Sequence, residues 1–233
     1  MKCRSMLERG VKLVYKTPKD IQERKDAKRR HILHIAARVF SNRGYHGTTV
    51  KDVVDEAGVS VGSFYFYFKN KEDLFETLYD EMTDMLLNAI NGVLEKYGVN
   101  ISEALSRTIA VALLTFRNYR DLARIMMIEA VGLSNCFELK RAESVRNVSN
   151  LIEEYLVSRK KQDCLDISDV HVAAIALCGT VYNSIINWLH KAGQSDLAGL
   201  AYPLAIYNLQ ALKIGFNTDD IRKYIETTLL DVE

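Results

Sequence analysis

The segment from Thr48 to Leu74 constrains the fold of this 233-residue chain more than any other part of it. Its sequence is TTVKDVVDEAGVSVGSFYFYFKNKEDL, in which two short runs with apolar periodicity are separated by a glycine, and each run follows a hydroxyl residue. A Ser or Thr before such a run accepts free backbone N–H groups of a helix's first turn, and a glycine permits a sharp turn. The segment therefore predicts two short helices that meet at a tight turn.

Turn and capping signals set which side chains point inward. Thr49 is predicted to cap the first helix and Ser60 the second, on either side of a turn at Gly58. In the second helix Phe64 and Phe68 lie one turn apart, and they are predicted to fill a small core between the helices. The side chains left to point elsewhere are those of Val61, Gly62, Ser63, Tyr65 and Tyr67.

These outward positions suit the major groove of DNA. The groove admits one α-helix, whose N-terminal residues reach base edges, and small side chains permit a close approach. Ser60 and Ser63 can bond to bases or phosphates, and Val61 can contact a thymine methyl group. Tyr65 and Tyr67 offer phenolic donors, although either one taken alone would more often be half-buried packing. With Thr49 and Lys71 placed at helix starts for phosphates, the predicted contacts with double-stranded DNA are Thr49, Ser60, Val61, Gly62, Ser63, Tyr65, Tyr67 and Lys71.

Residues 28 to 80 resemble the N-terminal domain of the tetracycline-repressor (TetR) family of bacterial and archaeal regulators. The resemblance rests on Ile35–Phe40 (IAARVF), Gly44–Tyr45 (GY), Thr48–Val50 (TTV), Ala57–Ser60 (AGVS), Gly62–Phe68 (GSFYFYF) and Lys71–Leu74 (KEDL). It implies a helix-turn-helix domain joined to a larger helical domain that dimerises and usually binds a small effector, and it places the family's DNA contacts on the eight positions above. Phe66 departs from the pattern, because many relatives have a polar residue or a histidine there, so no base preference is carried over.

Charge is unevenly distributed along the chain. The net charge is +1, but the first 80 residues hold 16 Lys and Arg against 11 Asp and Glu, and the remainder holds 15 against 19. Residues 1–30 hold 11 basic and 4 acidic residues, which either form a solvated extension or contact phosphates. We expect a basic arm over 1–22, the helix-turn-helix domain over 23–78, and an effector-binding and dimerisation domain over 79–233.

Several protein classes are disfavoured. We find no apolar run near the roughly 20 residues of a membrane span and no signal peptide, so we expect a cytoplasmic protein without membrane contact. Four scattered cysteines, Cys3, Cys136, Cys164 and Cys178, form no CxxC pair, and the five histidines are not grouped with them, so neither a metal nor another cofactor is expected. The GxSxG, HExxH, P-loop and GxGxxG motifs are missing, which argues against an enzyme.

Helical periodicity extends over almost the whole chain, which contains only two prolines, so the expected fold class is all-α. A first helix is predicted from about residue 20 to residue 43. Beyond the helix that begins at Asn70, helices are predicted near 102–117, 120–132, 137–160, 168–192, 197–213 and 218–230. Ser102 and Ser168 are predicted N-caps, and the breaks fall at Gly98, Gly132, Gly193 and Gly215.

Two of these later helices are too apolar to face water on all sides. Val170–Leu189 is apolar around most of its circumference, and Leu197–Leu212 is similar. We therefore expect a homodimer through the helices near 168–192 and 197–213, with a two-fold interface. Two recognition helices would then have to lie about 34 to 36 Å apart to enter successive major grooves.

The large domain is predicted to hold a hydrophobic small-molecule effector whose binding releases the protein from a palindromic operator. Ala123–Lys140 loosely resembles fatty-acyl-responsive TetR members, which favours a fatty acid or acyl-CoA. Control by a protein partner, without any small effector, is the alternative, and plain core packing is the alternative for each residue. The candidate lining residues are Phe116, Met126, Met127, Ile128, Val131, Tyr182, Ile186 and Trp188, with Glu129, His171, Asn183 and Asn187 as polar anchors.

Overall fold

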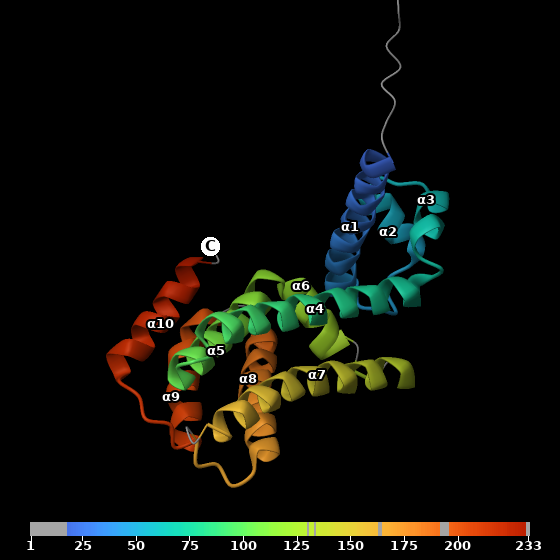
Figure 1. Ribbon diagram of the computed structural model, residues 1–233. Coiled ribbons are helices and arrows are strands. Elements are labelled where there is room, and N and C mark those ends of the chain that lie inside the picture. Colours follow the sequence, from blue (N-terminus) through green and yellow to red (C-terminus); the bar gives the residue numbers. More distant parts are fainter. Residues whose placement is uncertain (1–17, 130, 133, 163–164, 192–195, 232–233) are drawn as a thin grey trace, which may run out of the picture.

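The computed structural model describes residues 18–129, 131–132, 134–162, 165–191 and 196–231, and over these ranges the fold is all-α, as predicted (Figure 1). The α-helices are α1 (Pro18–Arg43), α2 (Val50–Ala57), α3 (Val61–Tyr67), α4 (Lys71–Tyr97), α5 (Ile101–Asn118), α6 (Arg120–Arg124), α7 (Asn135–Lys160), α8 (Val170–His190), α9 (Ala201–Ala211) and α10 (Thr218–Asp231). Two shorter segments are η1 (Ile125–Glu129), a π-helical turn, and η2 (Ala198–Leu200), a 3₁₀ turn.

Helices α1, α2 and α3 form the predicted small unit. Thr49 caps α2 in a reciprocal capping box, and Ser60 caps α3 by accepting the backbone N–H of Ser63. Gly58 ends α2 with a φ of 63°, a left-handed conformation that glycine adopts without a steric penalty. Phe64 and Phe68 are both buried, as expected for the two rings that fill the core between these helices.

Helix starts in the larger domain differ from prediction by one or two residues. Asn100 caps α5 in place of Ser102, whose hydroxyl instead donates to the Asn100 side chain at 2.9 Å. Asp169 caps α8 in place of Ser168. Asn and Asp cap helices at least as well as Ser, so sequence alone does not rank adjacent candidates. The predicted break at Gly193 lies outside the described residues.

The helix predicted over 120–132 is α-helical only as far as Arg124. It continues as the π-helical turn η1, which is followed by Gly132 at a φ of 74°. In a π-helical turn each backbone bond spans one residue more than in an α-helix, so the side chains of Met126 and Met127 are rotated from their α-helical positions. Such turns are frequent at functional sites.

Helix α4 connects the small N-terminal unit to the rest of the molecule (Figure 1). Its first turn follows α3, and its later turns pack against α5 and α7. The boundary expected between residues 78 and 79 therefore lies inside one continuous helix. In the larger domain α5 is buried along most of its length and packs against α4, α9 and α10, while α7 packs against α8.

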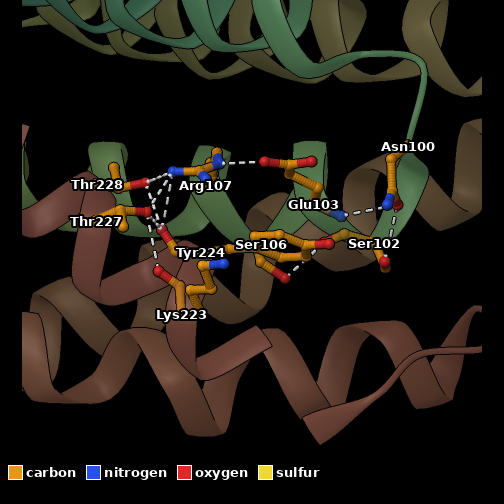
Figure 2. A network of polar contacts seen from close by, with 9 residues as sticks. All are labelled: Asn100, Ser102, Glu103, Ser106, Arg107, Lys223, Tyr224, Thr227 and Thr228. Atoms are coloured by element: carbon orange, nitrogen blue, oxygen red, sulfur yellow. Dashed lines mark hydrogen bonds and ion pairs between the residues drawn. The ribbon is translucent and has the colours of Figure 1, made fainter. Parts of the chain in front are cut away.

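Arg107 ties α10 to α5 (Figure 2). Its side chain is almost fully buried; Nε donates to Glu103 Oε1 at 2.9 Å, and the guanidinium carbon lies 4.2 Å from the centre of the Tyr97 ring. Its Nη1 donates to the Tyr224 carbonyl at 3.0 Å and to the hydroxyls of Thr227 and Thr228 at 2.9 Å each. A buried charge is tolerated where it is paired and hydrogen-bonded in this way.

Helix α8 corrects one expectation. Among the described residues it is the one helix long and apolar enough to cross a membrane by length and composition, with a mean hydropathy of 1.5 over its best window. The prediction that no run approaches this length was wrong because polar residues such as Thr180 and Asn183 interrupt the run but still leave its mean hydropathy at 1.5. A core helix of a globular protein passes the same test, and 39% of the window is buried against the rest of the chain.

We predict that Arg107→Ala lowers the free energy of unfolding by about 3 kcal/mol, because Glu103 and three acceptors of α10 lose their shared donor. Urea denaturation measures the change. The control is Lys223→Ala, which removes an exposed cation from α10 and should change stability by no more than about 0.5 kcal/mol. Equal losses in the two variants would contradict the role assigned to Arg107.

Candidate nucleic-acid interface and internal cavity

Helix α3 lies at the outer edge of the N-terminal unit, and α2 separates it from α1 in the view of Figure 1. The side chains of Val61 and Tyr65 are 50% and 54% exposed, and Gly62 is exposed between them in the first turn. Ser63 and Tyr67 are half-buried. Val61, Gly62 and Tyr65 therefore lie on an open side of α3, and Ser63 and Tyr67 lie at its half-buried border.

Phe66 extends this face and was not among the predicted contacts. Its ring is 64% exposed and lies one turn beyond Gly62, on the same line along the helix. The ammonium group of Lys25, from α1, is 5.3 Å from the ring centre. The spacing of four residues from Gly62 was a signal in the sequence, but the contact with Lys25 depends on how α1 packs.

The two predicted phosphate contacts are already engaged inside the protein. The Thr49 hydroxyl accepts the Asp52 backbone N–H at 3.2 Å and donates to its carboxylate at 2.6 Å. Hydrogen bonds from Thr49, with the nearby Arg43 guanidinium, hold the pKa of Asp52 below its usual value. The second of these residues, Lys71, begins α4.

Lys71 joins the start of α4 to the turn between α1 and α2. Its ammonium donates to the backbone carbonyls of Tyr45 and Thr48, at 2.8 Å each, and lies 4.2 Å from the centre of the Tyr45 ring. Burial lowers the pKa of Lys71. Two of the three N–H groups are thus used within the fold, and one remains for an outside acceptor. We call this arrangement the Lys71 clamp.

A cavity of about 410 Å³ lies inside the larger domain, between α4, α5, α7, α8 and η1. Five residues named from the sequence line it: Phe116, Met126, Met127, Tyr182 and His171. The lining residues that sequence reasoning missed come from α4, α5, α7 and α8, and include Tyr79, Thr83, Leu86, Ile90, Val148 and Ile152. In an amphipathic helix the residues that face a cavity have the same spacing as those that face a filled core, so no pattern separated them.

The other named residues lie outside this cavity. Glu129 lies beside the α1–α2 turn, where a Cβ added to Gly44 would come within 3.2 Å of Glu129 Oε2. Asn183 and Asn187 are exposed on α8, and Trp188 lies beneath Arg120, with 5.5 Å from the guanidinium carbon to the ring centre. Ile128, Val131 and Ile186 also lie outside the cavity lining.

Charged lining groups of the cavity are confined to its exposed border. Arg146 on α7 and His171 on α8 are both exposed, and we call these two residues the cationic rim. The His171 ring nitrogen Nδ1 is 2.8 Å from Glu153 Oε2, and this carboxylate raises the pKa of His171. Deeper in the cavity, burial raises the pKa of Tyr79, which keeps its hydroxyl neutral. In the described part of the chain, no group of three His, Cys, Asp or Glu side chains could hold a metal ion.

Known proteins match the N-terminal unit as a family domain and match most of the chain as individual relatives. Residues 32–78 match the model of the bacterial regulatory proteins of the tetR family. A fatty acid metabolism regulator protein of Bacillus subtilis (strain 168) is 24% identical over 180 residues, which cover 77% of this chain and 92% of the relative. Two further HTH-type transcriptional regulators of that organism match over only 36% and 40% of their own length.

Solved structures share the architecture along most of the chain. The fatty acid degradation regulator FadR of Bacillus halodurans has a TM-score of 0.71 at 25% identity, covering 77% of this chain and 97% of that one. FadR of Bacillus subtilis, solved in complex with stearoyl-CoA, has a TM-score of 0.69 at 23% identity, covering 77% and 96%.

The open α3 face lies in a helix-turn-helix domain that matches a family of regulators, and the helical domain that carries it has the architecture of solved regulators, which indicates a protein that acts on DNA. Residues 32–78 belong to the DNA-binding domain of the TetR family of transcriptional regulators.

Proposed function

We propose that this protein is a cytoplasmic, dimeric repressor that leaves a palindromic operator when a long-chain fatty acid or acyl-CoA occupies the cavity. The observation that carries the proposal is the cavity itself. Its volume falls in the range of small-molecule sites, its interior is apolar, and its charged lining groups lie at the exposed border. Control by a protein partner would not require such a space.

Chemistry of the lining favours an acyl chain with an anionic head. Each methylene group removed from water contributes about 0.8 kcal/mol, so a long chain gains affinity along the whole cavity. The cationic rim of Arg146 and His171 suits a carboxylate or the phosphates of coenzyme A. The stearoyl-CoA bound by the Bacillus subtilis relative is a ligand of this kind.

Helix α4 provides the connection from the cavity to the DNA-binding unit. Tyr79 and Thr83 of α4 line the cavity, and the Lys71 clamp holds the start of the same helix to the α1–α2 turn. Thr83 also bonds to Ser144 of α7, with 2.9 Å between the hydroxyl oxygens. An effector that binds better to a second arrangement of α4 and α7 would move the recognition helices and shift the population away from the operator-bound state.

A dimer interface is proposed on the outer faces of α8 and α9. Val172 of α8 is 58% exposed, and Tyr207 of α9 is 59% exposed. Ala176, which is exposed one turn after Val172 on α8, permits a close approach of a second helix. Covering these apolar groups with a second copy would give a two-fold interface and place two α3 helices on one DNA molecule.

We predict that Tyr65→Ala weakens operator binding by about 1–3 kcal/mol with little change in the melting temperature, because the proposed DNA contact uses the exposed part of the ring, which touches the core only at the edge of Phe64. Fluorescence anisotropy at fixed salt measures the affinity. Tyr119→Ala removes a comparably exposed tyrosine between α5 and α6 and should leave binding unchanged. Unaltered affinity in the Tyr65 variant would reject its place in the interface.

We predict that octadecanoic acid or stearoyl-CoA raises the melting temperature and releases the operator. A ligand at 100 times its Kd stabilises the folded state by about 2.7 kcal/mol. Ala112→Phe places a ring in the cavity and should abolish both effects while operator binding persists. A wild-type protein that responds to no acyl ligand would favour control by a protein partner.

We predict that Val172→Glu combined with Tyr207→Glu produces a monomer, because two carboxylates would be buried against their own symmetry mates. Light scattering after size exclusion should give the dimer mass for the wild type and 26.5 kDa for the variant. The control is Asn91→Glu, which places a carboxylate at an exposed position of α4 and should leave the dimer intact. A monomeric wild type would contradict the proposed interface.

A further inference from the structure

Buried hydroxyl groups on α5 normally have a partner in their own helix. The Ser106 hydroxyl donates to the Ser102 carbonyl at 2.6 Å, and the Thr115 hydroxyl donates to the Val111 carbonyl at 2.8 Å. Such a bond to the carbonyl four residues earlier is the usual way in which a helical Ser or Thr satisfies its hydroxyl. It leaves these two side chains with no need of a partner outside α5.

Thr108, on the same helix, is the exception. The residue is 3% exposed, and its hydroxyl has no hydrogen-bond partner among the described residues. The other buried side-chain atoms without a partner there are single guanidinium nitrogens of Arg120 and Arg159, both only partly buried. An unpaired buried hydroxyl destabilises the protein, and such groups in folded proteins call for a specific explanation.

The position of Thr108 supplies one. It lies in the wall of the cavity, together with Ile109 and Ala112 of α5 and Ile90 of α4. The charged lining residues, Arg146 and His171, are exposed on other helices. A carboxylate at Thr108 would be removed from water without a cation to pair with, whereas a neutral oxygen needs only one hydrogen bond.

We propose that the effector carries a neutral oxygen, as a hydroxyl or a ketone, on the part of its chain that lies against α5, and that Thr108 binds this oxygen. The inference rests on the proposed function and narrows its ligand class from plain to oxygenated acyl chains. Because the hydroxyl oxygen is shielded, the side chain must turn about its Cα–Cβ bond to reach the ligand. Threonine in a helix has two favoured rotamers between which it can turn.

The test compares octadecanoic acid with octadecanoic acids that carry one hydroxyl or one ketone at successive chain positions. Titration calorimetry on the full-length protein measures each Kd. We expect at least one oxygenated acid to bind wild-type protein about tenfold more tightly than octadecanoic acid, because only this ligand satisfies Thr108. Thr108→Val keeps the shape of the side chain and removes its hydroxyl. In this variant the oxygenated acid and octadecanoic acid should bind with about the same Kd.

Thr115→Val is the matched control. It removes a buried hydroxyl of the same helix that is already bonded to Val111, and Thr115 does not line the cavity. It should keep the wild-type ligand preference. Without ligand, Thr108→Val should raise the melting temperature, because it removes an unpaired polar group, and Thr115→Val should lower it.

Distinct results would overturn the two proposals. Tight binding of octadecanoic acid without preference for any oxygenated acid would overturn the role of Thr108 and leave the acyl effector standing. Failure of every acid and of stearoyl-CoA to bind would overturn both. A Thr108→Val variant that melts no higher than wild type would show that the hydroxyl is satisfied within the protein.

Discussion

The Lys71 clamp is the interaction on which the arrangement of the two parts of the molecule depends. One ammonium group bonds to the carbonyls of Tyr45 and Thr48 and lies over the Tyr45 ring, so the start of α4 cannot move without the α1–α2 turn. Tyr45 in turn packs edge-on against Phe75 of α4 and Phe137 of α7, with ring centres 4.9 and 5.6 Å apart. The α1–α2 turn is thereby held by α4 and α7, which are two of the helices that line the cavity.

A second route joins the cavity to the same turn. Met126 and Met127 line the cavity from the π-helical turn η1, which ends at Glu129 beside Gly44. Cavity walls on α4, α7 and η1 therefore each lead to the segment between α1 and α2. Because packed interiors shift between discrete arrangements and do not deform continuously, a ligand that favours one arrangement can reorient the whole N-terminal unit.

Local signals in the sequence were sufficient for most of the fold. The hydroxyl before α2, the glycine after it and the paired phenylalanines of α3 depend on neighbours a few residues away, and the structure has them as predicted. The clamp, the Arg107 network and the cavity depend on residues that are far apart in sequence, such as Arg107 and Thr228. Lys71 was assigned to phosphate because the sequence shows a cation at a helix start. The sequence does not show that the α1–α2 turn places the carbonyls of Tyr45 and Thr48 beside it. Cavity residues such as Ile90 and Ile152 could not be distinguished from core residues, because side chains that face a cavity have the same helical spacing as side chains that face a packed core.

The central claim is that the DNA-binding units move as rigid bodies with α4 when the cavity is filled. Pulsed electron resonance between spin labels on Lys51→Cys of the two subunits of the proposed dimer, in a background without the native cysteines, measures this directly, because Lys51 is exposed on α2. The account predicts one narrow distance distribution on operator DNA and a displaced but equally narrow one with the acyl ligand, and Lys71→Met should broaden both. An unchanged distance on ligand binding, or distributions in the Lys71 variant as narrow as in the wild type, would contradict it.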